Sequence, residues 1–407
     1  MKDVKTEAKS DSRKEVRFNT ATDEQIRMGL ASDIYFTRTL EELHRSGSDK
    51  KVVAEITVSG PLGNWFVFCG LDEVLTLMDG VNVDIYSIPE GSIVKPRDDN
   101  GIPVPVMRFE GKYSEFGKFE TSLLGFLCQA TGICTYSARI KQILGETPFY
   151  SFGIRRMHPS ISPMIDRAAY IGGAVGVSGI LGAELIGQKP VGTMPHALSI
   201  LVGDEAAWKL SAGDNSNGQK RVLLIDTFMD EKFAAITAAE TINNVDYIRL
   251  DTPSSRRGNF PSLIREVRWE LDLRGFRNVK IMVSGGLNAE NILELKEAGA
   301  EAFGIGTSIA SAKPYDFAMD IVEVEGTSLA KRGKYSGGKN VYKCQSCGSV
   351  IVKPSNYGKY ECSCGNMVEN LLGPVMKNGK LTGKRDDVEA IRKRCQESLH
   401  RMINSES

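Results

Sequence analysis

VKIMVSGGLNAENILELKEAGAEAFGIGTS, residues 279–308, is the stretch that decides the fold of this chain. Residues 279–283 are a short apolar run of strand length, and residues 302–305 form a second one. Between them, Asn288 can cap a helix over residues 289–298, whose apolar side chains share one face and which ends at a glycine. A strand, a helix and a strand in this order predict a parallel βαβ unit.

Both of these strands end in glycines. Gly285 and Gly286 follow the first strand, while Gly304 lies in the second and Gly306 and Thr307 follow it. Free backbone N–H groups at such turns, close to helix N-termini, bind a phosphate without help from a charged side chain. Ordinary β/α turns are the alternative interpretation, but two glycine turns in adjacent units favour a phosphate site at the C-terminal ends of the strands.

The same alternation of strands and helices recurs from Tyr150 onward. Strands are expected over residues 150–155, 176–181, 190–195, 221–226, 246–251, 279–283 and 302–305. Helices are expected over residues 161–174, 196–210, 231–242 and 261–274. Continuous apolar strands separated by helices are typical of a parallel sheet covered on both faces. The predicted fold class is therefore α/β, with an irregular (β/α) barrel as its main part.

Polar and charged side chains gather at the predicted C-terminal ends of these strands. Arg155, His196, Asp226 and Asp251 lie there, as do the glycines described above. Taken singly, each has a structural alternative, since an aspartate that ends a strand can cap the next helix and a histidine that begins a helix can do the same. As a set on one face of a barrel they predict an active site.

The rest of the chain divides into regions of different pattern. We expect a disordered tail over residues 1–20, which includes a charged and polar stretch. Residues 22–43 read as helical, and residues 21–120 are interpreted as an α+β domain that strands from about residues 315–340 complete. The barrel takes residues 121–314, beginning with a long apolar helix from residue 118 to 142. Residues 333–339 are a basic loop, read as a flexible surface turn, and residues 385–407 as a charged surface helix.

Composition limits the classes of protein. The 407 residues are 41% hydrophobic and 25% charged, with 51 basic and 51 acidic side chains. This balance gives no global charge argument for nucleic acid or an anionic membrane. No apolar run approaches the roughly 20 residues that a membrane span needs. With eight cysteines in so long a chain, a disulfide scaffold is not indicated, and a cytoplasmic location is expected.

Four of the cysteines are clustered near the C-terminus. Cys344 and Cys347 form one pair and Cys362 and Cys364 a second, each followed by a glycine. Two such pairs joined by a hairpin predict a closed, structural four-thiolate zinc site, although the second pair has one spacer residue instead of two. Iron, or an empty, reduced or disulfide-linked site, are the alternatives. Residues 341–407 are thus interpreted as a small zinc-ribbon-like domain with a C-terminal helix.

These motifs together resemble the type II phosphoribosyltransferases of NAD biosynthesis, most closely the archaeal-type nicotinate phosphoribosyltransferases. The resemblance covers roughly residues 22–340. It is carried by FETSLL at 119–124, SFGIRR at 151–156, GTMPHA at 192–197, RLD at 249–251, SGGL at 284–287 and GIGTS at 304–308. Each motif alone is weak, and their order and spacing are specific.

The resemblance implies a reaction and a set of roles. Nicotinate would displace pyrophosphate from phosphoribosyl pyrophosphate in the presence of Mg²⁺, forming nicotinate mononucleotide. The glycine turns would hold the 5′-phosphate, Asp251 and Asp226 the ribose hydroxyls or Mg²⁺, and Arg155 and Arg249 the pyrophosphate or the nicotinate carboxylate. Phe152 would stack on the pyridine ring. Tyr35 matches a tyrosine that completes the site of a second subunit, so a homodimer or higher homo-oligomer is implied.

His196 matches the histidine that ATP phosphorylates in the energy-linked members of the family, so ATP is expected as a co-substrate. The sequence departs from some relatives at Pro195, where they carry an acidic residue. Three alternatives stay open: a nicotinamide enzyme, a quinolinate enzyme, for which further Lys or Arg at the strand ends would be expected, and a non-catalytic phosphate-binding barrel whose zinc ribbon binds nucleic acid. The modest charge of the ribbon makes nucleic acid the least favoured partner.

Overall fold

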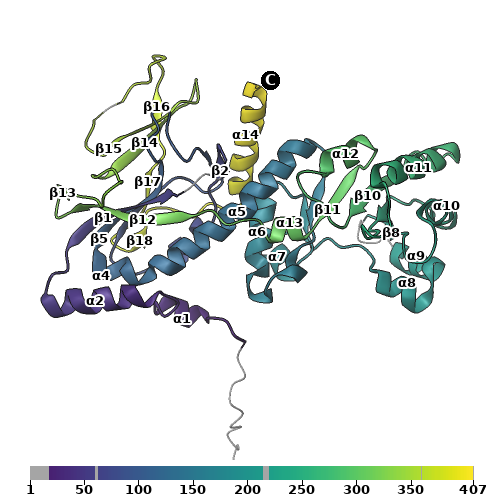
Figure 1. Ribbon diagram of the computed structural model, residues 1–407, viewed down its shortest axis with the longest axis horizontal. Helices are drawn as coiled ribbons and strands as arrows, with labels where there is room; N and C mark the ends of the chain where they lie inside the picture. The colour runs from purple at the N-terminus through teal and green to yellow at the C-terminus, as the bar shows by residue number, and fades with distance from the viewer. Residues whose placement is uncertain (1–17, 60–62, 214–219, 359, 407) are drawn as a thin grey trace, which may run out of the picture.

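The computed structural model describes residues 18–406 apart from residues 60–62, 214–219 and 359. Most of the predicted disordered tail, up to residue 17, lies outside these ranges. Figure 1 shows two bodies side by side, with the long helix α5 (Glu120–Leu144) running from one to the other. In the part of the chain that is described, no helix is long and apolar enough to cross a membrane.

One body is built on a six-stranded sheet in which every neighbouring pair of strands is parallel. In spatial order its strands are β7 (Gly176–Val177), β6 (Phe149–Ser151), β11 (Ala302–Ile305), β10 (Lys280–Ser284), β9 (Tyr247–Leu250) and β8 (Val222–Leu224). The sheet forms half a barrel, which confirms the predicted α/β class.

The sheet is open between β7 and β8, its two edges. The strand predicted over residues 190–195 would fill this gap, and that prediction is wrong: the segment has no regular structure. Val191 donates one backbone hydrogen bond to Val177. Pro190 and Pro195 have no N–H to continue a ladder, so the segment crosses the gap as an irregular connection.

Helices pack against this sheet and lie around it in Figure 1. They are α6 (Ser162–Ile171), α7 (Ile180–Leu185), α8 (His196–Val202), α9 (Asp204–Ala212), α10 (Glu231–Thr241), α11 (Phe260–Leu273), α12 (Ile292–Glu297) and α13 (Thr307–Ala310). Strand residues such as Ile248 and Phe303 share one buried cluster with helix residues such as Ile264 and Leu295. Because the strands and helices share this core, the end of each strand is held in place, and so are the residues that follow it.

Two predicted helices are interrupted at glycines. The helix expected over residues 196–210 is divided into α8 and α9 at Gly203, whose φ is 83°. The helix expected over residues 22–43 is divided into α1 (Asp23–Arg27) and α2 (Ile34–Ser46), with Gly29 at φ 78° between them. Positive φ is accessible to glycine and strained for other residues, so these glycines permit the breaks.

The second body has a seven-stranded antiparallel sheet. In spatial order it contains β13 (Thr327–Ser328), β12 (Phe317–Val324), β1 (Lys51–Val58), β5 (Pro105–Lys112), β3 (Asp84–Ser87), β17 (Gly373–Lys377) and β18 (Lys380–Leu381). Helices α3 (Leu71–Leu77) and α4 (Tyr113–Phe116) and the short pair β2 (Phe66–Val67) and β4 (Ile93–Val94) accompany it. As predicted, the chain returns after the barrel to add a strand, and β12 pairs with β1.

The last part of the chain contributes to three parts of the structure. β14 (Lys339–Cys344), β15 (Val350–Pro354) and β16 (Val368–Asn370) form a separate three-stranded sheet, while β17 and β18 join the large antiparallel sheet. Helix α14 (Val388–Glu406) packs against α5 and α6. The prediction of a surface helix is wrong for one face, because Ile391, Cys395 and Leu399 are buried in the core of the barrel body.

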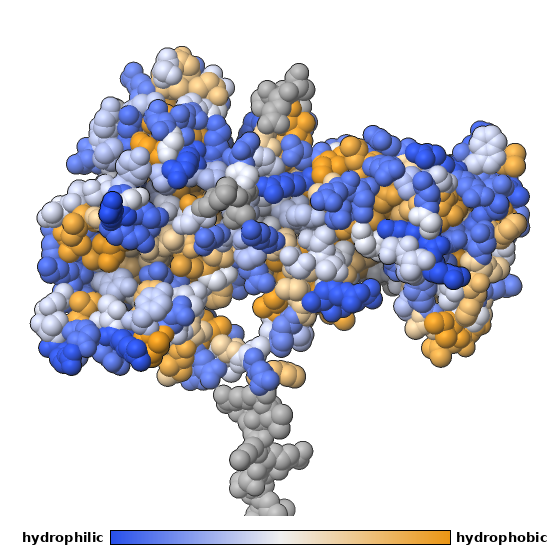
Figure 2. All heavy atoms as spheres, in the orientation of Figure 1, coloured by the Kyte–Doolittle hydropathy of each residue, from blue (hydrophilic) through white to orange (hydrophobic). Residues whose placement is uncertain are grey.

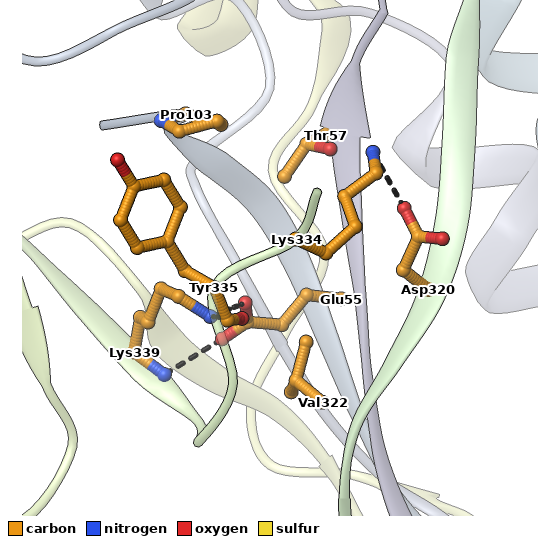
Figure 3. Close-up of a pocket in the computed structure, with 8 residues that line it drawn as sticks. All are labelled: Glu55, Thr57, Pro103, Asp320, Val322, Lys334, Tyr335 and Lys339. Carbon is orange, nitrogen blue, oxygen red and sulfur yellow. Dashed lines mark hydrogen bonds and ion pairs between the residues drawn. The ribbon is translucent and has the colours of Figure 1, made fainter. Parts of the chain in front are cut away.

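The basic loop over residues 333–339 is anchored to the antiparallel sheet, contrary to the expectation of a flexible surface turn. Lys334 forms an ion pair with Asp320 at 2.7 Å, and the buried Lys339 forms one with the buried Glu55 at 2.8 Å. Figure 3 shows both lysines pointing at these carboxylates within one small pocket. A buried carboxylate needs such a partner, which explains why the loop is held.

Candidate active site

The strand order brings most of the predicted residues together at the C-terminal ends of the parallel strands. β8, β9, β10 and β11 are consecutive neighbours, and they end next to Asp226, Asp251, Gly285 and Gly306 respectively. Because parallel strands point the same way, their C-terminal ends meet on one side. The polar residues scattered over the sequence thus form one cluster.

Asp251 and Arg249 lie at the centre of this cluster. Arg249 Nη2 donates to Asp251 Oδ2 at 2.8 Å, and Ser284 Oγ donates to Asp251 Oδ1 at 2.7 Å. Arg249 also donates from Nε to Ser284 Oγ and from Nη1 to Thr193 Oγ1, at 2.9 and 2.6 Å. The Asp251 carboxylate is therefore paired with a cation and held in one orientation by two neighbouring strands.

Asp226 is held differently. Its Oδ2 accepts hydrogen bonds from the backbone N–H of Asp251 at 2.7 Å and from Thr252 Oγ1 at 3.0 Å. Its Oδ1 is buried and has no hydrogen-bond partner among the described residues. Burial raises the pKa of this carboxyl above its usual value, against the opposing effect of the Asp251 N–H. An unpartnered buried carboxylate oxygen is costly, and it fits a site that accepts a hydroxyl group or a cation from a ligand.

His196, the first residue of α8, faces both carboxylates. Its Nε2 lies 3.7 Å from Asp251 Oδ2 and 4.0 Å from Asp226 Oδ1, and its Nδ1 lies 3.3 Å from Thr227 Oγ1. The imidazole is 39% exposed, whereas the Asp226 side chain is 1% exposed. The ring thus closes one side of the cluster and remains open to solvent and to a ligand.

The glycine turns adjoin the same cluster. Gly285 and Gly286 are exposed and adopt φ values of 85° and 66°, which only glycine tolerates easily. Gly306 and Thr307 end the neighbouring strand β11 and open α13. Asn288 does not cap the helix directly. Its side chain accepts the N–H groups of Glu290 and Asn291, and α12 starts at Ile292, the residue after Asn291. The first turn lies beside Asp251, because a Cβ on Gly285 would be 3.1 Å from Asp251 Oδ1, and the second turn follows the adjacent strand.

Phe152 packs against the strand between these turns. Its N–H donates to Ile305 O at 2.9 Å, and a Cβ built on Gly304 would come within 2.6 Å of the Phe152 ring. A Cβ on Gly153 would meet Gly306 O at 2.3 Å. Glycine at positions 153 and 304 therefore lets the loop after β6 lie directly on the end of β11. Phe152 is only partly buried, and its ring lies 6.0 Å from the ring of Tyr150, centroid to centroid.

Two predicted residues form no hydrogen bond or ion pair with this cluster within the described part of the chain. Arg155 is exposed in the short 3-10 helix Ile154–Arg156 and has no ion pair among the described residues. Tyr35 is 58% exposed on α2, which belongs to the other body in Figure 1. Within one chain, therefore, Tyr35 is not brought to the barrel residues.

Several residues of the cluster were not predicted. Ser284, Thr193 and Thr252 provide the hydroxyl groups that orient Arg249 and the two aspartates. Ser284 and Thr193 stand within the quoted motifs, so their positions could have suggested a role. Arg257 donates to Gly285 O at 2.9 Å and lies over the Phe260 ring. It follows β9 in an irregular loop, and no sequence pattern marks it.

The four clustered cysteines converge on one point in the ribbon. Their sulfur atoms all lie within 4.8 Å of one another. Cys344 Sγ is 3.6 Å from Cys364 Sγ, and Cys347 Sγ is 3.5 Å from Cys362 Sγ. These separations are too long for a disulfide bond, for which about 2.05 Å is required. They match the edges of a tetrahedron of thiolates around a zinc ion, so the donor set fits a metal despite the short second spacer.

Comparison with known proteins places this arrangement in a family. Residues 33–131 match the N-terminal domain of quinolinate phosphoribosyl transferase, and residues 133–320 match its C-terminal domain. The crystal structure of a nicotinate-nucleotide pyrophosphorylase from Pyrococcus furiosus is 48% identical, covers 95% of this chain and 98% of its own, and superposes with a TM-score of 0.90. Human nicotinic acid phosphoribosyltransferase shares the fold at 16% identity, with a TM-score of 0.70 over 91% of this chain and 94% of its own.

Curated relatives point the same way over shorter stretches. A nicotinate phosphoribosyltransferase of Mycobacterium tuberculosis is 28% identical over 264 residues, 62% of this chain and 56% of the relative. One from Bacillus subtilis is 28% identical over 324 residues, 70% of this chain and 64% of the relative. The matches thus span less than two thirds of these relatives. Closeness to an archaeal-type group stays a prediction. The two domain matches and the shared fold show that the chain belongs to the type II phosphoribosyltransferases of NAD biosynthesis.

Proposed function

We propose that the chain is a nicotinate phosphoribosyltransferase, which forms nicotinate mononucleotide and pyrophosphate from nicotinate and phosphoribosyl pyrophosphate. The observation that carries this proposal is the single cluster in which Asp226, Asp251, Arg249 and His196 meet two glycine turns at the C-terminal edge of the sheet. The curated relatives named above supply the reaction and the base.

In this reaction the pyridine nitrogen forms a bond to the anomeric carbon of the ribose while the carbon–oxygen bond to pyrophosphate breaks. The transition state carries positive charge on the ribose, which nearby carboxylates stabilise. The turns at Gly285, Gly286, Gly306 and Thr307 hold the 5′-phosphate through backbone N–H groups. Phe152 stacks on the pyridine ring.

The two arginines have different roles in this proposal. The guanidinium of Arg249 already donates to Asp251, Ser284 and Thr193, so it orients the carboxylates and balances their charge. Arg155 is exposed and suited to bind an anion, either the departing pyrophosphate or the nicotinate carboxylate. Mg²⁺, when bound, neutralises pyrophosphate charge. Asp226 and Asp251 are its candidate protein ligands, because Mg²⁺ is usually held by one or two carboxylates together with substrate phosphates.

His196 is the residue through which ATP would act. An exposed imidazole whose Nε2 lies between two carboxylates can accept a phosphoryl group from ATP, and transfer of that group to water would link ATP hydrolysis to nucleotide formation. The support is its position beside Asp226 and Asp251 and its partial exposure. This step adds an ATP-dependent, ligase-type activity to the basal transfer.

Two further parts of the proposal concern structure and assembly. The four cysteines bind a structural Zn²⁺, supported by their geometry. Tyr35 completes the site of a second copy, so the protein acts as a homodimer or a higher assembly. Exposed apolar side chains support a covered surface: α8, at the lower right of Figure 1, carries the exposed Ile200, Leu201 and Val202, and Figure 2 shows an apolar area at the same end of the molecule. Measuring the molecular mass of the protein in solution tests whether it forms a homodimer or a higher assembly.

The deciding experiment measures pyrophosphate release from phosphoribosyl pyrophosphate and Mg²⁺ with nicotinate, nicotinamide or quinolinate, each with and without ATP. Release with nicotinate supports the proposal, and a rate raised by ATP supports the role of His196. The variant Asp251→Asn should lose most activity, whereas Glu301→Gln, at an exposed carboxylate without an ion pair among the described residues, should keep it. Release with another base alone refutes the nicotinate assignment. No release with any base would favour the nucleic-acid alternative, tested by salt-dependent binding.

A further inference from the structure

Helix α6 carries a buried carboxylate that none of the roles above uses. Asp166 is fully buried, and its side chain lies between the ends of β6 and β7. Ser151 Oγ donates to Asp166 Oδ1 at 3.1 Å, and the N–H of Gly179 donates to Asp166 Oδ2 at 3.0 Å. No ion pair to Asp166 is formed within the described ranges. Burial raises the pKa of this carboxyl to about 6, so its retention in the core is costly.

The two donors stand at chemically important points of the chain. Ser151 is the last residue of β6, immediately before Phe152. Gly179 caps α7 and follows Ser178, the first residue after β7. The same two ends are joined by a backbone hydrogen bond from Ser178 N to Ser151 O at 3.0 Å. One carboxylate thus holds the start of the Phe152 loop and the loop after β7 together.

Two glycines allow α7 and the residue before it to pack closely against the Asp166 side chain. A Cβ on Gly179 would meet Asp166 Oδ2 at 2.3 Å, and a Cβ on Gly182 would meet the same oxygen at 2.5 Å. Helix α7 therefore lies directly on the carboxylate. The next residue, Arg167, points to the other body and forms two hydrogen bonds to Glu90, at 2.7 and 3.0 Å. Arg167 thus ties α6 to the other body, while Asp166 bonds to the two loops.

We propose that Asp166 is a positioning residue for the base-binding side of the site: it fixes Phe152 and the loop after β7 in the arrangement that receives the pyridine ring. This inference rests on the proposed function. The ring of Phe152 packs against Gly304, and the next residue, Gly153, packs against Gly306. Asp166 holds the start of the same loop from within the helix layer. The phosphate-binding turns on β10 and β11 are not bonded to Asp166, so the effect falls on the base and not on phosphoribosyl pyrophosphate.

The test compares KM for nicotinate with KM for phosphoribosyl pyrophosphate in three variants. Ser151→Ala removes one bond, Asp166→Ala removes both, and Asp166→Asn can keep both, since its oxygen accepts from Gly179 and its amide donates to Ser151 Oγ. Ser137→Ala is the matched control, because Ser137 is a buried serine whose hydroxyl has no partner among the described residues.

We expect Ser151→Ala and Asp166→Ala to raise KM for nicotinate by about fivefold or more, the factor that corresponds to one ordinary hydrogen bond. KM for phosphoribosyl pyrophosphate should change less than about twofold, and Asp166→Asn and Ser137→Ala should resemble the wild type in both constants. Equal changes in the two KM values, or no change in Ser151→Ala, would overturn the inference even if Asp166→Ala fails to fold. The wild-type protein alone decides the proposed function: if it uses a different base, the variants are compared with that base, and the two conclusions fail separately.

Discussion

The contact between Gly304 and Phe152 gives a sharp test of where the base binds. In Gly304→Ala, the new Cβ would lie 2.6 and 2.8 Å from two atoms of the Phe152 ring and 3.2 Å from Ser284 Cβ. Carbon atoms prefer separations of about 3.5 Å or more, so the ring has to retreat by roughly 1 Å. The backbone of Gly304 does not have positive φ, so alanine itself is tolerated there. The strain therefore falls on the ring, which is partly exposed and can rotate, more than on Ser284 within its strand.

The expected effect follows from the value of an aromatic stack. A well-placed aromatic pair contributes about 0.5–1.5 kcal/mol beyond its buried area. Losing it should raise KM for nicotinate by between about twofold and about tenfold, with KM for phosphoribosyl pyrophosphate little changed. The assay is pyrophosphate release with nicotinate varied at saturating phosphoribosyl pyrophosphate, and then the reverse. Gly125→Ala on α5 is the control, because a Cβ there meets nothing within 4 Å.

A Phe152→Leu background shows whether Gly304→Ala acts through the Phe152 ring. In a Phe152→Leu background the alanine has no ring to displace, so Gly304→Ala should add little further loss. If Gly304→Ala leaves KM for nicotinate unchanged while the protein is folded, Phe152 does not receive the base. If the loss is as large in the Phe152→Leu background as in the wild type, the alanine acts through Ser284 and the Arg249–Asp251 pair instead.

Three further changes test other parts of the reasoning. His196→Ala should remove stimulation by ATP and leave a basal transfer; undiminished stimulation, measured as pyrophosphate release with and without ATP, would refute the phosphohistidine role. Replacing Cys344 and Cys347 together by Ser should release zinc, measured by atomic absorption, and lower Tm with little effect on turnover; loss of turnover in folded, metal-free protein would show that the site is not merely structural. Between pH about 4 and about 6, folded Asp166 retains a proton that the unfolded chain has lost, because burial raises its pKa to about 6. Its contribution to stability therefore falls as pH rises through this window, by up to about 3 kcal/mol. Asp166→Asn cannot ionise, so it should flatten the decline of Tm with pH. Identical Tm profiles for the wild type and the variant would count against a raised pKa at Asp166.

The alternation of apolar strands and helices was enough to predict the parallel sheet, because each element has a clear local pattern. The strand over residues 190–195 was predicted wrongly because its apolar residues suggest a strand, while its two prolines deny it the ladder bonds. Helix α14 shows the opposite limit. Its buried residues Ile391, Cys395 and Leu399 recur every four positions, a helical stripe that predicts a partner. Which surface it covers depends on where α5 and α6 lie, and no local pattern contains that information.

The site divides in the same manner. Residues at strand ends could be predicted, since parallel strands place their C-terminal ends together. Arg249 lies in β9 and Asp251 follows its last residue, two positions further on, so a shared face follows from the period of two. The contact of Ser284 with both depends on β10 being the neighbour of β9, which the order of strands in the sequence does not guarantee. Asp166 lies in the middle of a helix without a motif, and only the structure reveals it.

The two aspartates of the site are chemically unequal. Asp251 is paired with Arg249 and accepts from Ser284, so both of its oxygens have donors and its charge is balanced by a cation at 2.8 Å. Asp226 has donors on one oxygen only, its other oxygen lies 4.0 Å from His196 Nε2, and it is the more deeply buried of the two. Burial makes its charged form costly, and a bound hydroxyl or cation would relieve that cost. Asp226 is thus the carboxylate that gains more from a ligand, while Asp251, whose oxygens each have one donor already, also keeps the surrounding groups in place.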